Sequence, residues 1–407
     1  MPDLLFLAHR IPYPPDKGDK IRSWHILKFL AERMRVHLGC FIDDQNDRPY
    51  IDKLRDLCAS THFVSLDPLK ARLASLRGLV RGEPLSLAFY RSRSMARWVD
   101  ARLARDGIDH VFLFSSPMAQ YVLGNTKRAI TVMDFVDVDS DKWAQYAAGK
   151  SWPQSVLYNR ESRRLLEFER RVARRASASL FVSSAEAGLF RALAPESNGK
   201  IRYMNNGVDF DFFSPEVHYD DPYGGEGPCL VFTGAMDYWA NVDAVEWFAR
   251  EVFPAVLAKA PQARFFIVGG RPTGRVRALS ALNGVAVTGR VPDVRPYIAH
   301  AAAAVAPLRI ARGVQNKVLE AMAMAKPVVA TSQAAEGIEA RPGAELMVAN
   351  GAVDFAQAIA DILGRSNDNN MGGMARDRII TSYDWSKNLT LLERMYRVGN
   401  SNQDLKG

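Results

Sequence analysis

The sequence has few cysteines and no long apolar run, and both absences limit what the protein can be. Its 407 residues include three cysteines, Cys40, Cys58 and Cys229, which lack the spacing of a metal site or a disulfide framework. No window approaches the roughly 20 apolar residues of a membrane-spanning helix. The start, MPDLLFLAHRIPYPP, has no basic leader and too short an apolar run for a signal peptide. We therefore expect reduced thiols in a cytoplasmic protein that is soluble or bound only to a membrane surface.

A GxGxxG fingerprint directly after the first strand is also missing from both halves of the chain. The stretch IVGGRPTG (267–274) is weak evidence of nucleotide binding, because glycines end strands in most α/β folds. An NAD-dependent dehydrogenase is therefore disfavoured.

Short apolar runs alternate with amphipathic stretches along the whole chain. The expected strands are 4–9, 36–42, 110–116, 129–135, 179–184 and 201–206, then 229–234, 264–270, 285–289, 303–308, 327–331 and 345–349. The expected helices include 19–34, 156–176, 241–259 and 314–325. Most strand runs are continuously apolar, as in parallel sheets buried on both faces.

This pattern and the chain length predict two doubly wound α/β domains. We expect an N-terminal domain at 1–205, a Gly-, Pro- and Asp-rich linker at 206–228, and a second domain at 229–375. The remainder, 376–407, should end in a helix that crosses back to the first domain. A ligand cleft is expected between the carboxyl ends of the two sheets.

The net charge of +8 is concentrated in one segment, 68–105. Its basic residues are Lys70, Arg72, Arg77, Arg81, Arg91, Arg93, Arg97, Arg102 and Arg105, and its only acids are Glu83 and Asp100. Leu69, Leu73, Leu76, Leu79 and Val80 are interleaved at helical spacing. Such a segment could face an anionic membrane or an anionic acceptor, or it could be a solvated helix packed on its own domain. No nucleic-acid-binding motif accompanies the charge.

The stretch RGVQNKVLEAMAMAKPVVAT, residues 312–331, predicts a phosphate site. Gly313 precedes a helix whose first backbone amides, those of Val314, Gln315 and Asn316, are open donors. Lys317 adds a charge that the helix dipole disfavours unless an anion lies there. Glu320 follows on the same helix face and could bind a ribose diol. The alternative is a Lys317–Glu320 surface pair.

Two further strand ends carry glycines that would let a ligand approach the backbone, Gly234 in VFTGAMDYWANVDAVEWF and Gly269 in IVGG. After the first of them, Asn241 should begin a helix whose positive end suits Asp243 and Glu246.

These motifs, together with VTGRVPDVRPY, VAPLRIARG and PYPPDKGDKIRSWHILKFLAER, resemble the retaining glycosyltransferases of family four, which have the GT-B fold. DFVDVDSDKW, GAMDYW and RIARGVQNKVLEAMAMA resemble most closely the sugar transferases of bacterial PEP-CTERM/exosortase exopolysaccharide loci. The resemblance implies transfer of a sugar from a UDP or GDP donor with retention of anomeric configuration, without a cofactor or an essential metal.

The resemblance also implies roles for individual residues. Glu320 would hold the donor ribose, and Gly313, Val314 and Lys317 would bind the diphosphate. Arg290 would border the base, and Gly18 would belong to the glycine loop of the first domain. Trp385 matches an aromatic residue of the C-terminal helix.

The sequence departs from the family at two places. Arg312 stands where a first glutamate usually contacts the transferred sugar, which implies an altered donor contact. The first domain has the acidic run DFVDVDSDKW (134–143) and no histidine nearby. Asp137 and Asp139 are candidates for contact with the acceptor or the sugar. Alternatively they bind a divalent metal, as in the other glycosyltransferase fold, or Asp139 or Ser140 caps a helix.

We therefore expect an enzyme with Asp137, Asp139 and Lys317 as catalytic residues, acting on the cytoplasmic membrane face with a lipid-linked saccharide as acceptor. A sugar-nucleotide epimerase, a nucleotide-sugar-binding scaffold without activity and a metal-dependent transferase remain alternatives.

Overall fold

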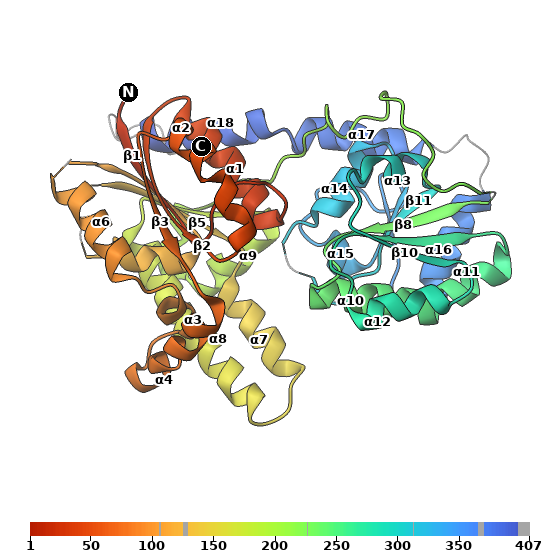
Figure 1. The fold of residues 1–407 in the computed structure, drawn as a ribbon, viewed down its shortest axis with the longest axis horizontal. Helices are drawn as coiled ribbons and strands as arrows, with labels where there is room; N and C mark the ends of the chain where they lie inside the picture. Colours follow the sequence, from red (N-terminus) through yellow and green to blue (C-terminus); the bar gives the residue numbers. More distant parts are fainter. Residues whose placement is uncertain (106, 125–128, 226, 312, 365–369, 398–407) are drawn as a thin grey trace. The chain divides into compact units, whose positions relative to one another are not determined.

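The computed structural model describes residues 1–105, 107–124, 129–225, 227–311, 313–364 and 370–397, which form two compact units (Figure 1). Unit 1 comprises Met1–Asn205 and the described residues from Ser386 onward, whereas unit 2 comprises Asn206–Trp385. Each unit has a parallel sheet and a hydrophobic core of its own.

The sheet of unit 1 has seven parallel strands in the order β3-β2-β1-β4-β5-β6-β7. They are β1 (Asp3–Ala8), β2 (Arg35–Ile42), β3 (Ser60–Ser65), β4 (His110–Phe114), β5 (Ile130–Val136), β6 (Ala178–Phe181) and β7 (Ile201–Tyr203). The strand order reverses between β1 and β4, and at such a point the loops diverge and leave room for a ligand.

The sheet of unit 2 has six parallel strands in the order β10-β9-β8-β11-β12-β13, with the reversal between β8 and β11. They are β8 (Cys229–Thr233), β9 (Arg264–Val268), β10 (Val285–Gly289), β11 (Ala303–Ala306), β12 (Val328–Ala330) and β13 (Met347–Val348). The two doubly wound sheets confirm the predicted fold class.

Helices follow almost every strand. Those of unit 1 are α1 (Gly18–Ala31), α2 (Ile51–Leu57), α3 (Pro68–Ser75), α4 (Arg77–Arg81), α5 (Leu85–Phe89), α6 (Arg93–Arg105), α7 (Asp139–Ala148), α8 (Gln154–Arg175), α9 (Ser184–Leu193) and α18 (Trp385–Arg397), whose first residue lies in unit 2. Unit 2 contains α10 (Trp239–Trp247), α11 (Phe253–Lys259), α12 (Gly274–Arg277), α13 (Arg295–His300), α14 (Asn316–Ala323), α15 (Ser332–Ala335), α16 (Ala352–Gly364) and α17 (Met371–Ser382). Within the described ranges, no helix has the length and apolar character needed to cross a membrane.

The structure corrects the expected elements in several places. The sequence pattern missed β3, because STHFVS mixes polar and apolar residues and forms a half-buried strand at the sheet edge. The strand expected at 345–349 is reduced to Met347–Val348. The stretch 206–228 forms no helix or strand in its described part, and its Val208 is buried and bonded to the backbone of Tyr383.

Candidate active site

The carboxyl ends of two central strands of unit 2 carry glycines that bring backbone segments close together. Gly234 follows β8 with a φ of 155°, and Gly269 follows β9 with a φ of 153°. A Cβ atom on Gly269 would lie 1.7 Å from the carbonyl oxygen of Gly234, so only glycine fits there. The amide of Gly269 donates to the carbonyl oxygen of Gly289 at the end of β10 (3.1 Å). Two neighbouring strands therefore lead at this sheet edge into residues without side chains.

Lys317 reaches this glycine-lined edge from α14, which follows β11 beside the point of strand reversal. Its Nζ donates to Oδ1 of Asn241 at 2.6 Å and lies 4.0 Å from the ring centroid of Phe232. A Cβ atom on Gly234 would lie 3.2 Å from the same nitrogen. The ammonium group is thus fixed at the carboxyl end of β8.

Lys317 and Glu320 are both partly buried, and neither has a charged partner within ion-pair distance in the described part of the chain. Burial lowers the pKa of Lys317 to about 7, although the charge of Glu320 opposes this. Burial likewise raises the pKa of Glu320 to about 7, against the effect of Lys317. The ion pair required by the surface-pair alternative is therefore not formed. An anion beside Lys317 would favour its charged form.

The start of α14 differs from the sequence prediction by two residues. The helix begins at Asn316 with Gln315 as its N-cap residue, rather than at Val314. Within the described ranges, the backbone amides of Asn316 and Lys317 donate no hydrogen bond. Gly313 has a φ of 65° and lets the chain turn into the helix. The open donors thus lie in the first turn of α14, which also carries Lys317.

Helix α10 also begins earlier than expected, at Trp239, so Asn241 lies within the first turn instead of starting the helix. Its side-chain amide donates to the backbone and its oxygen accepts from Lys317. Asp243 and Glu246 lie beyond the first turn, and each forms an ion pair with an arginine. Their expected role at the positive helix end is therefore wrong.

The other predicted donor-binding residues lie at different places. Arg290 follows β10, is exposed, and lies beside Gly270. Gly18 is the exposed first residue of α1 in unit 1. Trp385 is buried against Gly207. Arg312 lies outside the described residues, so its effect on the donor site stays a prediction.

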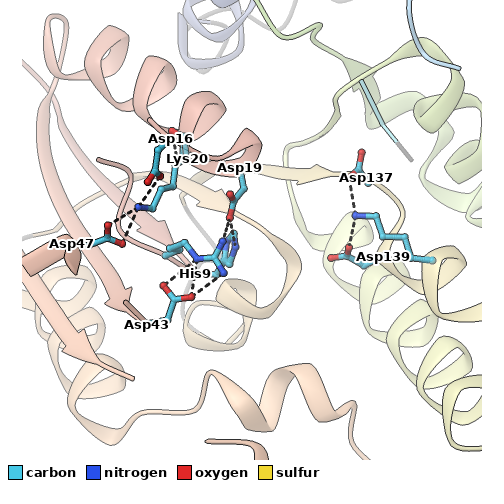
Figure 2. A network of polar contacts seen from close by, with 11 residues as sticks. His9, Asp16, Asp19, Lys20, Asp43, Asp47, Asp137 and Asp139 are labelled. Atoms are coloured by element: carbon cyan, nitrogen blue, oxygen red, sulfur yellow. Dashed lines mark hydrogen bonds and ion pairs between the residues drawn. The ribbon is translucent and has the colours of Figure 1, made fainter. Parts of the chain in front are cut away.

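In unit 1, Asp137 and Asp139 follow β5 and bind the ammonium group of Lys142 between them, at 2.8 and 3.2 Å (Figure 2). Burial alone would lower the pKa of Lys142, but the two carboxylates raise it well above its usual value. Val138 is the N-cap residue of α7 and makes no side-chain cap, so the helix-capping alternative is wrong. Ser140 instead donates to a buried glutamate, Glu169, at 2.5 Å.

The metal-site alternative finds no support in this arrangement. In the described part of the chain, no three His, Cys, Asp or Glu side chains are grouped as a metal ion would require. Lys142 lies where a cation shared by Asp137 and Asp139 would bind.

Sequence reasoning missed a second charged group at the same sheet edge. Arg10, just after β1, pairs with Asp43 after β2 at 2.9 Å and with Asp19 in α1 at 2.6 Å. His9 Nε2 lies 3.3 Å from Asp19, and its ring stacks on Phe114 at the end of β4. Burial would raise the pKa of Asp19, but His9 and Arg10 hold it well below its usual value. The signal was available, because charged residues directly after neighbouring parallel strands meet at one edge.

Two buried ion pairs hold α1 next to the charged group formed by His9, Arg10, Asp19 and Asp43. Lys20 is 1% exposed and binds both carboxylate oxygens of Asp47 at 2.8 Å, with Asp16 at 3.2 Å (Figure 2). Arg22 and Asp134 are completely buried and pair at 2.8 Å. These contacts hold the beginning of α1, and with it Gly18 and Asp19, at the carboxyl edge of the sheet.

Comparison with known proteins finds a family similarity in the second unit. Residues 227–365 match the family model described as glycosyl transferases group 1, a segment that contains the glycine-lined edge and α14. The second unit of the chain thus contains a segment similar to group 1 glycosyltransferases. No curated protein matches its sequence.

Solved structures match the chain over nearly its whole length and share the GT-B fold. HepE from Anabaena, solved with UDP and glucose, has a TM-score of 0.68 and 15% identity and covers 97% of this chain and 99% of its own. Sucrose-phosphate synthase from Thermosynechococcus elongatus has a TM-score of 0.69 and 16% identity, covering 98% of both chains. WaaG, a glycosyltransferase involved in lipopolysaccharide biosynthesis, has a TM-score of 0.60 and 14% identity, covering 96% of this chain and 99% of its own.

Proposed function

We propose that the protein is a group 1 glycosyltransferase that moves a sugar from a UDP-sugar to a saccharide acceptor with retention of configuration. The observation that supports the donor site is Lys317, which has no carboxylate partner among the described residues, reaches a glycine-lined sheet edge, and lies in the first turn of a helix whose first backbone amides donate no hydrogen bond within the described ranges. HepE, which shares the fold, has been solved with UDP and with UDP-glucose, and this supports uracil as the base.

In this proposal the diphosphate rests on the start of α14. Lys317 and the amides of Asn316 and Lys317 would stabilise the charge that grows on the leaving nucleotide. Glu320 would accept hydrogen bonds from the ribose diol, and Arg290 would border the base. The acceptor oxygen forms the new bond to the anomeric carbon as the bond to the phosphate oxygen breaks. The acceptor proton passes to that phosphate oxygen, a step implied by the family resemblance.

Unit 1 would contact the acceptor or the transferred sugar through Asp137 and Asp139, whose orientation Lys142 fixes. We infer a lipid-linked acceptor in bacterial exopolysaccharide assembly on the cytoplasmic membrane face, with the basic segment 68–105 near the membrane. The exosortase-associated pathway rests only on the resemblance of the sequence motifs.

The proposal is tested by incubating the protein with a panel of nucleotide sugars and measuring release of UDP or GDP, with and without lipid extract. We expect UDP release that needs an acceptor and persists in chelator. Conversion of the donor without an acceptor would favour an epimerase, binding without turnover a scaffold, and loss of activity in chelator a metal-dependent transferase. No release from any donor would refute a transferase.

A further inference from the structure

The helical segment formed by α3 and α4 turns its large apolar residues toward solvent. Leu69, Leu73, Leu76 and Val80 are 71, 70, 50 and 91% exposed. Their spacing of four, three and four residues places them on one helix face, because only Leu76 separates α3 from α4 and it has helical backbone angles. An unpartnered stripe of this kind marks an interaction surface.

Small residues of the same segment face the protein. Ala71 and Ser75 are 9 and 8% exposed, and Gly78 is also buried. The segment is therefore packed on its own domain through these small residues, and its leucine stripe stays exposed to solvent. Helix α6, the second half of the basic segment, behaves differently, because its Met95 and Val99 are completely buried. Only residues 68–81 of the basic segment 68–105 therefore present an exposed apolar stripe that could contact a membrane.

A second exposed apolar group lies at the tip of the hairpin formed by α7 and α8. Trp152 in the connecting loop is 79% exposed, and Val156 in the first turn of α8 is 59% exposed. Figure 1 shows this tip at the same end of unit 1 as α3 and α4. Arg160, one turn after Val156, donates to the backbone oxygen of Gly78 in α4 at 3.0 Å. The tip and the leucine stripe therefore belong to one connected surface.

The charge of this surface identifies its partner. Residues 68–81 and 149–160 contain no acidic residue. Their exposed basic residues are Lys70, Arg72, Arg77, Arg81 and Lys150. Exposed leucines and a tryptophan bordered by cations match the acyl and headgroup layers of an anionic bilayer.

We propose that residues 68–81 and 149–156 form one docking surface that holds unit 1 on an anionic membrane. The inference rests on the proposed lipid-linked acceptor, and it adds the α7–α8 tip as a second anchor. Basic residues contribute the attraction to the surface, at about five-fold in affinity each, equivalent to ~1 kcal/mol. Apolar residues insert below the headgroups.

Co-sedimentation of the full chain with lipid vesicles tests whether this surface binds an anionic membrane. We expect binding to vesicles of phosphatidylcholine with phosphatidylglycerol, and at least ten-fold weaker binding to phosphatidylcholine alone. Leu73→Gln and Trp152→Gln should each weaken binding several-fold, and together they should abolish it, without a change in melting temperature. Val353→Gln is the matched control, because Val353 is equally exposed, at 79%, but lies in unit 2.

The proposal would be overturned if the protein did not bind vesicles, or if it bound neutral and anionic vesicles equally. It would also be overturned if the Leu73→Gln and Trp152→Gln variants bound like the wild type. Self-association of the wild type that both variants abolish, without vesicle binding, would assign the surface to a protein partner instead. UDP affinity measured by calorimetry separates this test from the proposed function. The docking variants should keep wild-type UDP affinity. Failure of the wild type to bind UDP would refute the proposed function without bearing on the docking surface.

Discussion

Replacing Lys317 by methionine should stabilise the protein and weaken its donor site at the same time. Burial lowers the pKa of Lys317 from 10.5 to about 7, so the folded state disfavours its charge. At ~1.4 kcal/mol per pKa unit the full shift corresponds to about 5 kcal/mol. Partial exposure and the hydrogen bond to Asn241 reduce the expected gain. We expect Lys317→Met to raise the free energy of unfolding by about 1–3 kcal/mol at pH 6.

The sign of the pH dependence follows from the direction of the pKa shift. Below pH 7 Lys317 is protonated in both folded and unfolded protein, so the destabilising charge is fully present. Between about pH 7 and 10.5 the folded state has lost a proton that the unfolded state keeps, and wild-type stability rises relative to the variant. The advantage of Lys317→Met should therefore shrink between pH 6 and pH 9.

Binding should change in the opposite direction. A hydrogen bond to a charged group contributes about 1.5–3 kcal/mol, so loss of the ammonium group should weaken UDP binding about 10- to 150-fold. Urea unfolding at pH 6 and 9, with calorimetry of UDP binding, measures both effects. Lys326→Met is the matched control, because burial also lowers the pKa of Lys326 but this residue lies beyond the other end of α14. A destabilised Lys317→Met with normal UDP affinity would refute the reasoning and make Lys317 a structural partner of Asn241.

Three further predictions concern single residues. Glu320→Ala should weaken UDP binding about five-fold or more, by ~1 kcal/mol, and unchanged affinity in the folded variant would remove Glu320 from the site. Gly269→Ala should lower the melting temperature strongly because its Cβ would meet the carbonyl of Gly234, whereas Gly274→Ala has open space and should be tolerated. Burial and the charge of Asp139 raise the pKa of Glu169 to about 8, so stability present below about pH 4.5 should be lost as pH rises through 8. Glu169→Gln should flatten this dependence in urea unfolding between pH 5 and 9, and an unchanged slope would contradict it.

The fold could be predicted from the sequence because it follows from local patterns. Continuous apolar runs such as LLFLA can bury both faces only inside a parallel sheet, and the helices between them fix a doubly wound topology. The cationic start of α14 was likewise visible, since Lys317 stands in the first turn where the dipole disfavours it. Its contact with Asn241 was not, because that contact joins residues 76 positions apart in sequence.

The contacts of unit 1 could not be read from the sequence with the same success, because they depend on which strands become neighbours. His9, Arg10 and Asp43 come together only when β1 lies beside β2. The exposed leucine stripe was ambiguous for another reason. A helix with leucines on one face and small residues on the other can bury either face, and the protein buries Ala71, Ser75 and Gly78.

The charges at the two sheet edges favour different ligands. At the edge of unit 1, Arg10, Lys20 and Lys142 are each already paired with two carboxylates, so an incoming anion would have to compete with them. Neutral hydroxyl groups can instead accept and donate hydrogen bonds there without separating a pair. At the edge of unit 2, Lys317 binds an amide oxygen and has no carboxylate within ion-pair distance in the described residues. An anion could therefore bind its ammonium group without displacing a carboxylate. We therefore propose that the diphosphate binds to unit 2 and that the hydroxyl-rich part of the substrates contacts unit 1.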